Sequence, residues 1–177
     1  SIKYVNQILD FSQKRNYKFG LIKAYNMLGT IYSQTSDFNN AISNYQKAID
    51  LAKEDIYAKE LSSCLYNLST TYFDKGDYNN SFDACTASLK IKIANKDSAG
   101  ITRCYREMAE IYTYKEDYKK ALFYAENALG IQRKLNSNVG LARCLSTAAG
   151  VYIGLKQYTD AIKYLRQAES LIDDENE

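Results

Sequence analysis

The stretch Leu28-Gly29-Thr30-Ile31-Tyr32 returns three more times along the chain in related form. Its counterparts are Leu68-Ser69-Thr70-Thr71-Tyr72, Met108-Ala109-Glu110-Ile111-Tyr112 and Ala148-Ala149-Gly150-Val151-Tyr152. The closing tyrosine therefore recurs every 40 residues. A fixed period of this length is typical of repeat proteins, in which each repeat is one small unit that packs on its neighbours.

Other positions keep the same period, which makes a chance match untenable. Six residues after each tyrosine comes a second aromatic residue, preceded in three repeats by aspartate and in the fourth by Gln157. Small residues then recur at two further positions of each repeat. The aromatic residues are Phe38, Tyr78, Tyr118 and Tyr158, and the small residues are Ala41, Ser81, Ala121, Ala161, Ala48, Ser88, Ala128 and Ala168.

Each repeat predicts two amphipathic helices joined by a polar break. Apolar residues are spaced three, four and seven apart in both halves of the repeat, as on one face of a helix. Asp37, Asp77 and Asp117 precede the second helix, where an aspartate can accept hydrogen bonds from unpaired first-turn amides. Short polar connectors then force successive hairpins to stack.

We therefore predict a single array over residues 1–177. Its four hairpins cover residues 20–54, 58–95, 99–135 and 139–172, and residues 1–19 are in phase with a second helix, as in a truncated hairpin. We expect at least one more helix to precede this segment in the natural protein. Residues 173–177 form an acidic tail, which we expect to be frayed and solvated.

The residues Tyr25-x-x-Leu28-Gly29-x-x-Tyr32, followed by Ala41, Tyr45 and Ala48, resemble the tetratricopeptide repeat. The resemblance implies an all-α fold, a right-handed alpha-alpha superhelix of stacked hairpins. The chain departs from the family pattern by lacking proline and by its 40-residue period, against about 34 in the family. In that length it looks like the long-repeat arrays of bacterial sensory and regulatory proteins.

Composition disfavours several classes of function. The chain has no histidine, which removes the commonest general base and a leading zinc ligand. A net charge of +2 without a basic run disfavours nucleic-acid binding, and no apolar run is long enough for a membrane span. No nucleophile paired with a base and no phosphate loop can be found. We predict neither an enzyme nor a metal or cofactor site.

The four cysteines are predicted to be free, buried packing residues. Cys64, Cys104 and Cys144 share one repeat position with Ala24, so they are separated by whole repeats, too far for a disulfide. Cys85 shares the position of Tyr45 and could approach Cys104. Reduced thiols favour a reducing compartment such as the cytoplasm.

Most of the 17 tyrosines also fall on repeating positions, and these are predicted to belong to the core. They are Tyr25, Tyr32, Tyr45, Tyr72, Tyr78, Tyr105, Tyr112, Tyr118, Tyr152 and Tyr158.

The family resemblance implies that the first helix of each hairpin lines an inner, concave face where ligands bind. Tyr66, Phe73 and Tyr114 are aromatic at positions of this face where solvent is expected, and arginines give it a positive charge. Arginine and aromatic residues are typical of interface hot spots, and arginine can pair with carboxylates. The candidate binding residues are Lys23, Asn26, Tyr66, Asn67, Phe73, Arg103, Arg106, Tyr114 and Arg143. The alternative is a solvated face whose arginines pair with Glu107 and Glu110 on the same helix.

Two functional hypotheses follow. The first is a scaffold whose concave face binds a protein or peptide carrying acidic groups. The second is a sensory or regulatory segment of a larger bacterial signalling protein, such as a sensor kinase or a transcription regulator.

Overall fold

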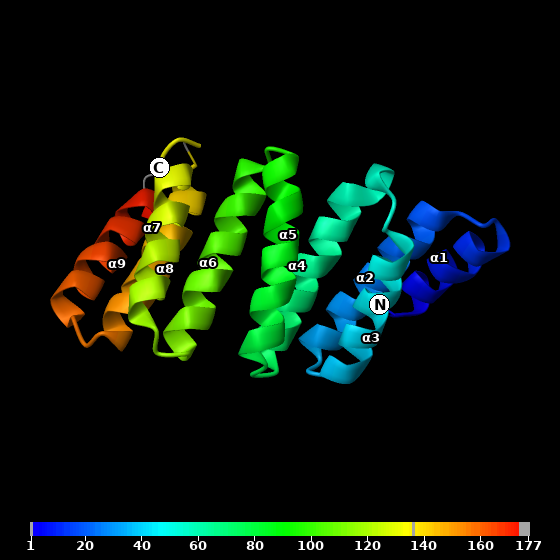
Figure 1. Cartoon of the computed structure of the whole chain (residues 1–177), viewed down its shortest axis with the longest axis horizontal. Helices are drawn as coiled ribbons and strands as arrows, with labels where there is room; N and C mark the ends of the chain where they lie inside the picture. The colour runs from blue at the N-terminus through cyan, green and yellow to red at the C-terminus, as the bar shows by residue number, and fades with distance from the viewer. Residues whose placement is uncertain (1, 136, 174–177) are drawn as a thin grey trace. The chain divides into compact units, whose positions relative to one another are not determined.

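The computed structural model describes residues 2–135 and 137–173, and in these residues it contains nine α-helices and one short 3-10 helix (Figure 1). The helices are α1 (Ile2–Lys14), α2 (Lys18–Gln34), α3 (Phe38–Leu51), η1 (Asp55–Tyr57), α4 (Ala58–Asp74), α5 (Tyr78–Ala94), α6 (Ser98–Tyr114), α7 (Tyr118–Gln132), α8 (Asn138–Gly154) and α9 (Tyr158–Asp173). The end of the predicted acidic tail, residues 174–177, lies outside the described residues.

The chain forms two compact units, Ser1–Asn95 and Lys96–Glu177, which we call the first and second unit. In the first unit α2 pairs with α3 and α4 with α5, while α1 packs on α2 and α4 packs on both α2 and α3. The second unit repeats this plan, since α6 pairs with α7, α8 pairs with α9, and α8 packs on both α6 and α7. We call α2, α4, α6 and α8 the first helices and α3, α5, α7 and α9 the second helices.

The predicted aspartate caps are confirmed at the start of three second helices. The carboxylates of Asp37, Asp77 and Asp117 accept hydrogen bonds from the backbone amides three residues ahead, at 3.3, 3.2 and 3.2 Å. Each cap satisfies a first-turn N–H group that has no partner within the helix. The caps therefore fix where the second helices begin.

A residue with left-handed backbone conformation closes each turn between a first and a second helix. The φ angles are 59° at Ser36, 84° at Gly76, 58° at Glu116 and 61° at Lys156. Only one of the four is glycine, the residue for which this conformation carries no steric cost. The turn geometry therefore repeats every 40 residues although its residue type does not.

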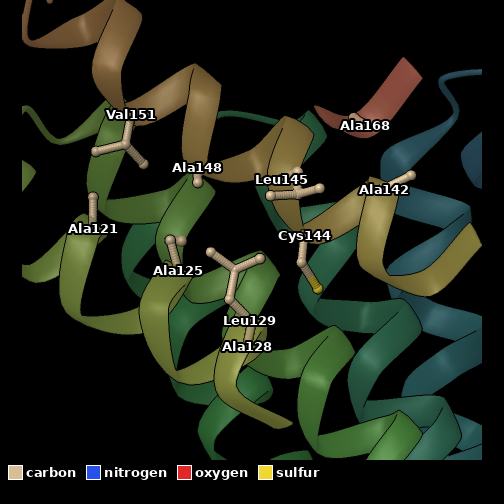
Figure 2. Packing of buried hydrophobic residues seen from close by; sticks show 11 residues of the cluster. Ala121, Ala125, Ala128, Leu129, Ala142, Cys144, Leu145, Ala148, Val151 and Ala168 are labelled. Atoms are coloured by element: carbon tan, nitrogen blue, oxygen red, sulfur yellow. The ribbon is translucent and has the colours of Figure 1, made fainter. Parts of the chain in front are cut away.

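Small residues let the helices approach closely, and large side chains fill the space that they leave. In the first unit a Cβ atom added at Gly29 would lie 2.6 Å from the ring of Tyr45, which is 2% exposed. In the second unit alanines of α7 face α8 around Cys144, Leu145 and Val151 (Figure 2). One hairpin could not bury these faces alone, so packing of neighbouring hairpins stabilises each unit.

The tyrosines correct one prediction. Of the ten assigned to the core, only Tyr45 is buried; eight are half-buried and Tyr158 is 59% exposed. Most of these rings pack against the buried clusters of their unit while part of each residue stays exposed. Tyr118, for example, packs against Gly154 of the next hairpin, and no helix follows α9 in the described residues to cover Tyr158 in the same way.

Candidate functional site

In the first unit, three of the predicted site residues take part in polar contacts between α2 and α4. Lys23 Nζ lies 3.2 Å from Glu60 Oε1, and Asn67 Nδ2 donates a hydrogen bond of 3.0 Å to Asn26 Oδ1. Thr71 Oγ1 donates to Ser33 Oγ at 3.0 Å further along the same pair of helices. These contacts join two hairpins, so Lys23, Asn26 and Asn67 have a structural role on this face.

The first-unit aromatic residues are less exposed than expected. Tyr66 and Phe73 are both half-buried, and the Phe73 ring lies 5.6 Å from the ring of Tyr78 in a tilted arrangement. The expectation that solvent surrounds these two rings is wrong, and for Phe73 the reason is that the start of α5 supplies an aromatic neighbour. In the second unit Tyr114 is 63% exposed, as expected.

In the second unit, Arg106 is held by residues of both first helices. Its Nε atom donates a hydrogen bond of 3.0 Å to Thr147 Oγ1, and its Nη2 atom lies 3.8 Å from Glu110 Oε1. Burial raises the pKa of the Glu110 carboxyl, an effect that the nearby Arg106 opposes. The same-helix pairing proposed as the alternative is therefore present at Arg106, although at a distance beyond that of a good hydrogen bond.

A cavity of about 450 Å³ lies between α6 and α8 in the second unit. Arg103, Arg106 and Arg143 all line it, and among the described residues no aspartate or glutamate does. Leu135 and Val139 add apolar surface, and they are 39% and 41% exposed. The structure thus brings together three of the predicted site residues around one positively charged hollow.

Sequence reasoning missed the other polar residues that shape this cavity. Gln132 is 5% exposed and donates a hydrogen bond of 3.4 Å to the backbone oxygen of Ser137. Ser137 in turn accepts a hydrogen bond from the amide of Gly140 and caps α8. The sequence contained one indication of this region, because Gly20, Gly100 and Gly140 share a repeat position that holds Glu60 in the remaining repeat.

The four cysteines are free, as predicted. All four are buried, and no group of residues that could hold a metal ion is found in the described part of the chain. Burial raises the pKa of the Cys64 thiol to about 12 and that of Cys144 to about 11. Both thiols are therefore protonated at neutral pH, which makes them poor nucleophiles.

The two units define an all-α protein of stacked helical hairpins that share a 40-residue period. The family model of the tetratricopeptide repeat matches residues 61–134 and 106–173, and a second model of the same repeat matches residues 22–55. The chain belongs to the tetratricopeptide repeat family. Members of this class are generally non-catalytic scaffolds for protein interaction, built on extended surfaces of repeated helices.

Solved structures share this fold at low sequence identity. BtubC (BKLC) from P. vanneervenii is 16% identical, with a TM-score of 0.79 over 90% of this chain and 66% of that one. A Rap protein complexed with Competence and Sporulation Factor is 19% identical, with a TM-score of 0.77 over 89% of this chain and 44% of that one. Aspartyl phosphate phosphatase F from Bacillus subtilis is 18% identical, with a TM-score of 0.79 over 95% of this chain and 45% of that one.

The chain therefore spans slightly less than two thirds of BtubC and less than half of the other two proteins. At these identities the likeness shows the fold alone. No curated protein matches the sequence significantly. No helix in residues 2–135 and 137–173 is long and apolar enough to cross a membrane.

Proposed function

We propose that the first-helix face of the second unit binds an extended acidic segment of a partner protein. The observation that carries this proposal is the cavity between α6 and α8, which three arginines line. Guanidinium groups pair with carboxylates through two parallel hydrogen bonds, and arginine is enriched among residues that dominate binding energy. The proposed role is recognition through a preformed surface, with no catalytic step.

The same face of α6 sets the length of the bound segment. Arg103, Arg106, Glu110 and Tyr114 are spaced three, four and four residues apart and so follow one stripe of the helix. From Arg103 to Tyr114 the stripe runs about 16 Å at 1.5 Å per residue. About five residues of an extended peptide cover that distance. We therefore expect an acidic residue of the ligand to lie about five positions from an apolar or aromatic one.

The first-unit residues have a supporting place in this proposal. Lys23, Asn26 and Asn67 are engaged in contacts between α2 and α4, so we assign them to maintaining the first-helix face. Binding of this kind would also serve the regulatory role that the long repeat suggests, because a regulator must recognise its signal before it responds. Competence and Sporulation Factor bound to a Rap protein of the same fold supports that extension.

A peptide library tests the proposal directly. We expect peptides selected by the protein to carry aspartate or glutamate, and the triple variant Arg103→Ala, Arg106→Ala, Tyr114→Ala to bind them about 100-fold more weakly. Fluorescence anisotropy with labelled peptides would give the dissociation constants.

The matched control removes two cations and one aromatic ring from α7 and the residues after it, namely Phe123, Arg133 and Lys134. All three are exposed, and Phe123 is 60% exposed. This triple alanine variant should keep wild-type affinity. Equal loss of binding in the two triple variants, or selection of peptides without acidic residues, would contradict the proposal.

A further inference from the structure

The α6–α8 cavity has a counterpart in the first unit that shows what kind of group fits there. A shift of 80 residues, two repeats, superposes the repeat positions of α2, α3 and α4 on those of α6, α7 and α8. Arg103 then corresponds to Lys23, and Gly140 corresponds to Glu60. The two units can therefore be compared position by position, each within its own packing.

In the first unit a carboxylate of the chain itself lies between the two first helices. Glu60 of α4 reaches Lys23 of α2, with 3.2 Å between Oε1 and Nζ. The Glu60 side chain is only 11% exposed, so its carboxylate is largely removed from water. A charge this shielded from solvent requires a partner, which Lys23 supplies.

In the second unit the position of Glu60 holds Gly140, while three arginines line the cavity beside it. Gly140 has no side chain, and the Gln132 amide fills the place where a Cβ atom would lie. In the first unit the position of Gln132 holds Ala52, which leaves room beside Glu60. The first unit thus has Ala52 and Glu60 at these two positions, and the second unit has Gln132 and Gly140.

Across the positions that line the cavity, the cations increase from two in the first unit, Lys23 and Lys59, to three in the second. The position of Arg106 holds Asn26 in the first unit, and the position of Arg143 holds Ser63. Both arginines line the cavity together with Arg103. The acidic residues on α6, Glu107 and Glu110, do not line it. The second unit therefore has more positive charge than the first at the corresponding place, and none of the described residues that line the cavity carries a carboxylate.

We infer that the α6–α8 cavity is a subsite for a side-chain carboxylate of the bound partner, which takes the place that Glu60 takes between α2 and α4. Arg103 and Arg143 bind the carboxylate, and Arg106, oriented by its hydrogen bond to Thr147, completes the positive wall. This inference rests on the proposed function and adds the chemistry of one ligand position to it.

The lining favours glutamate over aspartate at that position. Leu135 and Val139 present partly exposed apolar surface beside the arginines. The two methylene groups of a glutamate side chain can contact this surface while the carboxylate reaches the guanidinium groups. A cavity of about 450 Å³ accommodates such a side chain together with part of its backbone.

Blocked single residues test the subsite separately from peptide binding. The probes are acetyl-glutamate amide, its uncharged analogue acetyl-glutamine amide, and acetyl-glutamine with a free terminal carboxylate. Arginine side-chain NMR signals report the binding of each probe. We expect the glutamate probe to bind about tenfold more tightly than acetyl-glutamine amide, the scale of a hydrogen bond to a charged group. Equal binding of these two probes, or tighter binding of the chain-end carboxylate, would overturn the inference.

A double variant fills the subsite by introducing the two residues, alanine and glutamate, that the first unit has at the positions of Gln132 and Gly140. Gln132→Ala with Gly140→Glu should lower the affinity for the glutamate probe about tenfold, because the new carboxylate occupies the arginines. Gln132→Ala with Gly140→Ala, the matched control, should keep affinity within about threefold, since it opens the same space without adding a charge. Wild-type affinity in the glutamate variant would overturn the inference. If that variant fails to fold, Arg103→Ala must weaken the glutamate probe instead.

Tyr114→Ala separates this inference from the proposed function. The ring lies outside the cavity lining, so the variant should bind the single-residue probe normally while it loses affinity for longer peptides. Peptide binding that depends on Tyr114, together with a probe that does not respond, would refute the subsite and leave the proposed function standing. A probe that responds while no acidic peptide binds would refute the proposed function alone.

Discussion

Replacing Tyr45 by alanine is expected to lower the free energy of unfolding of the first unit by about 4 kcal/mol. The side chain is 2% exposed and its ring packs against the backbone of Gly29. Its hydroxyl donates a hydrogen bond of 3.2 Å to Thr30 Oγ1. Burial raises the pKa of this phenol, so it stays protonated at neutral pH. Alanine would leave a cavity between two hairpins that the surrounding helices cannot fill.

Two control variants separate packing from other effects. Tyr45→Phe keeps the ring and loses only the hydroxyl, so it should cost about 1 kcal/mol. Tyr114→Ala removes a ring that is 63% exposed and should change stability by less than about 0.5 kcal/mol. Urea unfolding followed by circular dichroism gives all three values. Equal losses from Tyr45→Ala and Tyr114→Ala would show that this packing is misassigned.

Reversing two charges in the cavity is expected to exchange the preferred ligand. With Arg103→Glu and Arg143→Glu, the protein should bind acidic peptides about 100-fold more weakly, because carboxylates then face carboxylates. Peptides in which lysine replaces the acidic residues should gain affinity for the same variant. Titration of both peptide types against both proteins by calorimetry measures the exchange.

The control for this exchange is a second double reversal, Arg133→Glu with Lys134→Glu, directly after α7. Both double variants change the net charge of the chain by the same amount, so they differ only in where the charges lie. The reversal at Arg133 and Lys134 should leave both affinities within about threefold of wild type. If the two double variants weaken acidic peptides equally, binding depends on overall charge and the cavity has no special part in it.

The hairpins could be predicted from the sequence because they depend on local patterns. The helical spacing of apolar residues and the aspartate caps act within a few residues of each other, and the spacing returns in four repeats and the caps in three. The left-handed residues at the turns could not be predicted in the same way. Of Ser36, Gly76, Glu116 and Lys156, only glycine signals that conformation, so three were invisible to sequence reasoning.

The candidate binding residues could be predicted in less detail because some of their contacts are with residues of other hairpins. Repeat position placed Arg103, Arg106 and Arg143 on one face, and the structure brings them to one cavity. Repeat position did not predict that Lys23 pairs with Glu60 or that Asn26 accepts a hydrogen bond from Asn67. Those contacts depend on how α2 and α4 pack. The sequence shows that Glu60 occupies a repeat position that holds glycine in the other three repeats. The consequence of this difference could be understood only from the structure, in which the Gln132 side chain packs against Gly140.

We propose that a partner binds the first helices of the second unit. Hydrogen–deuterium exchange with a selected acidic peptide tests it most directly, because it reports which amides the peptide protects. We expect slower exchange in α6 and α8 around Arg103, Arg106 and Arg143, with α7 and α9 unchanged. Protection confined to α7 and α9 would contradict the claim.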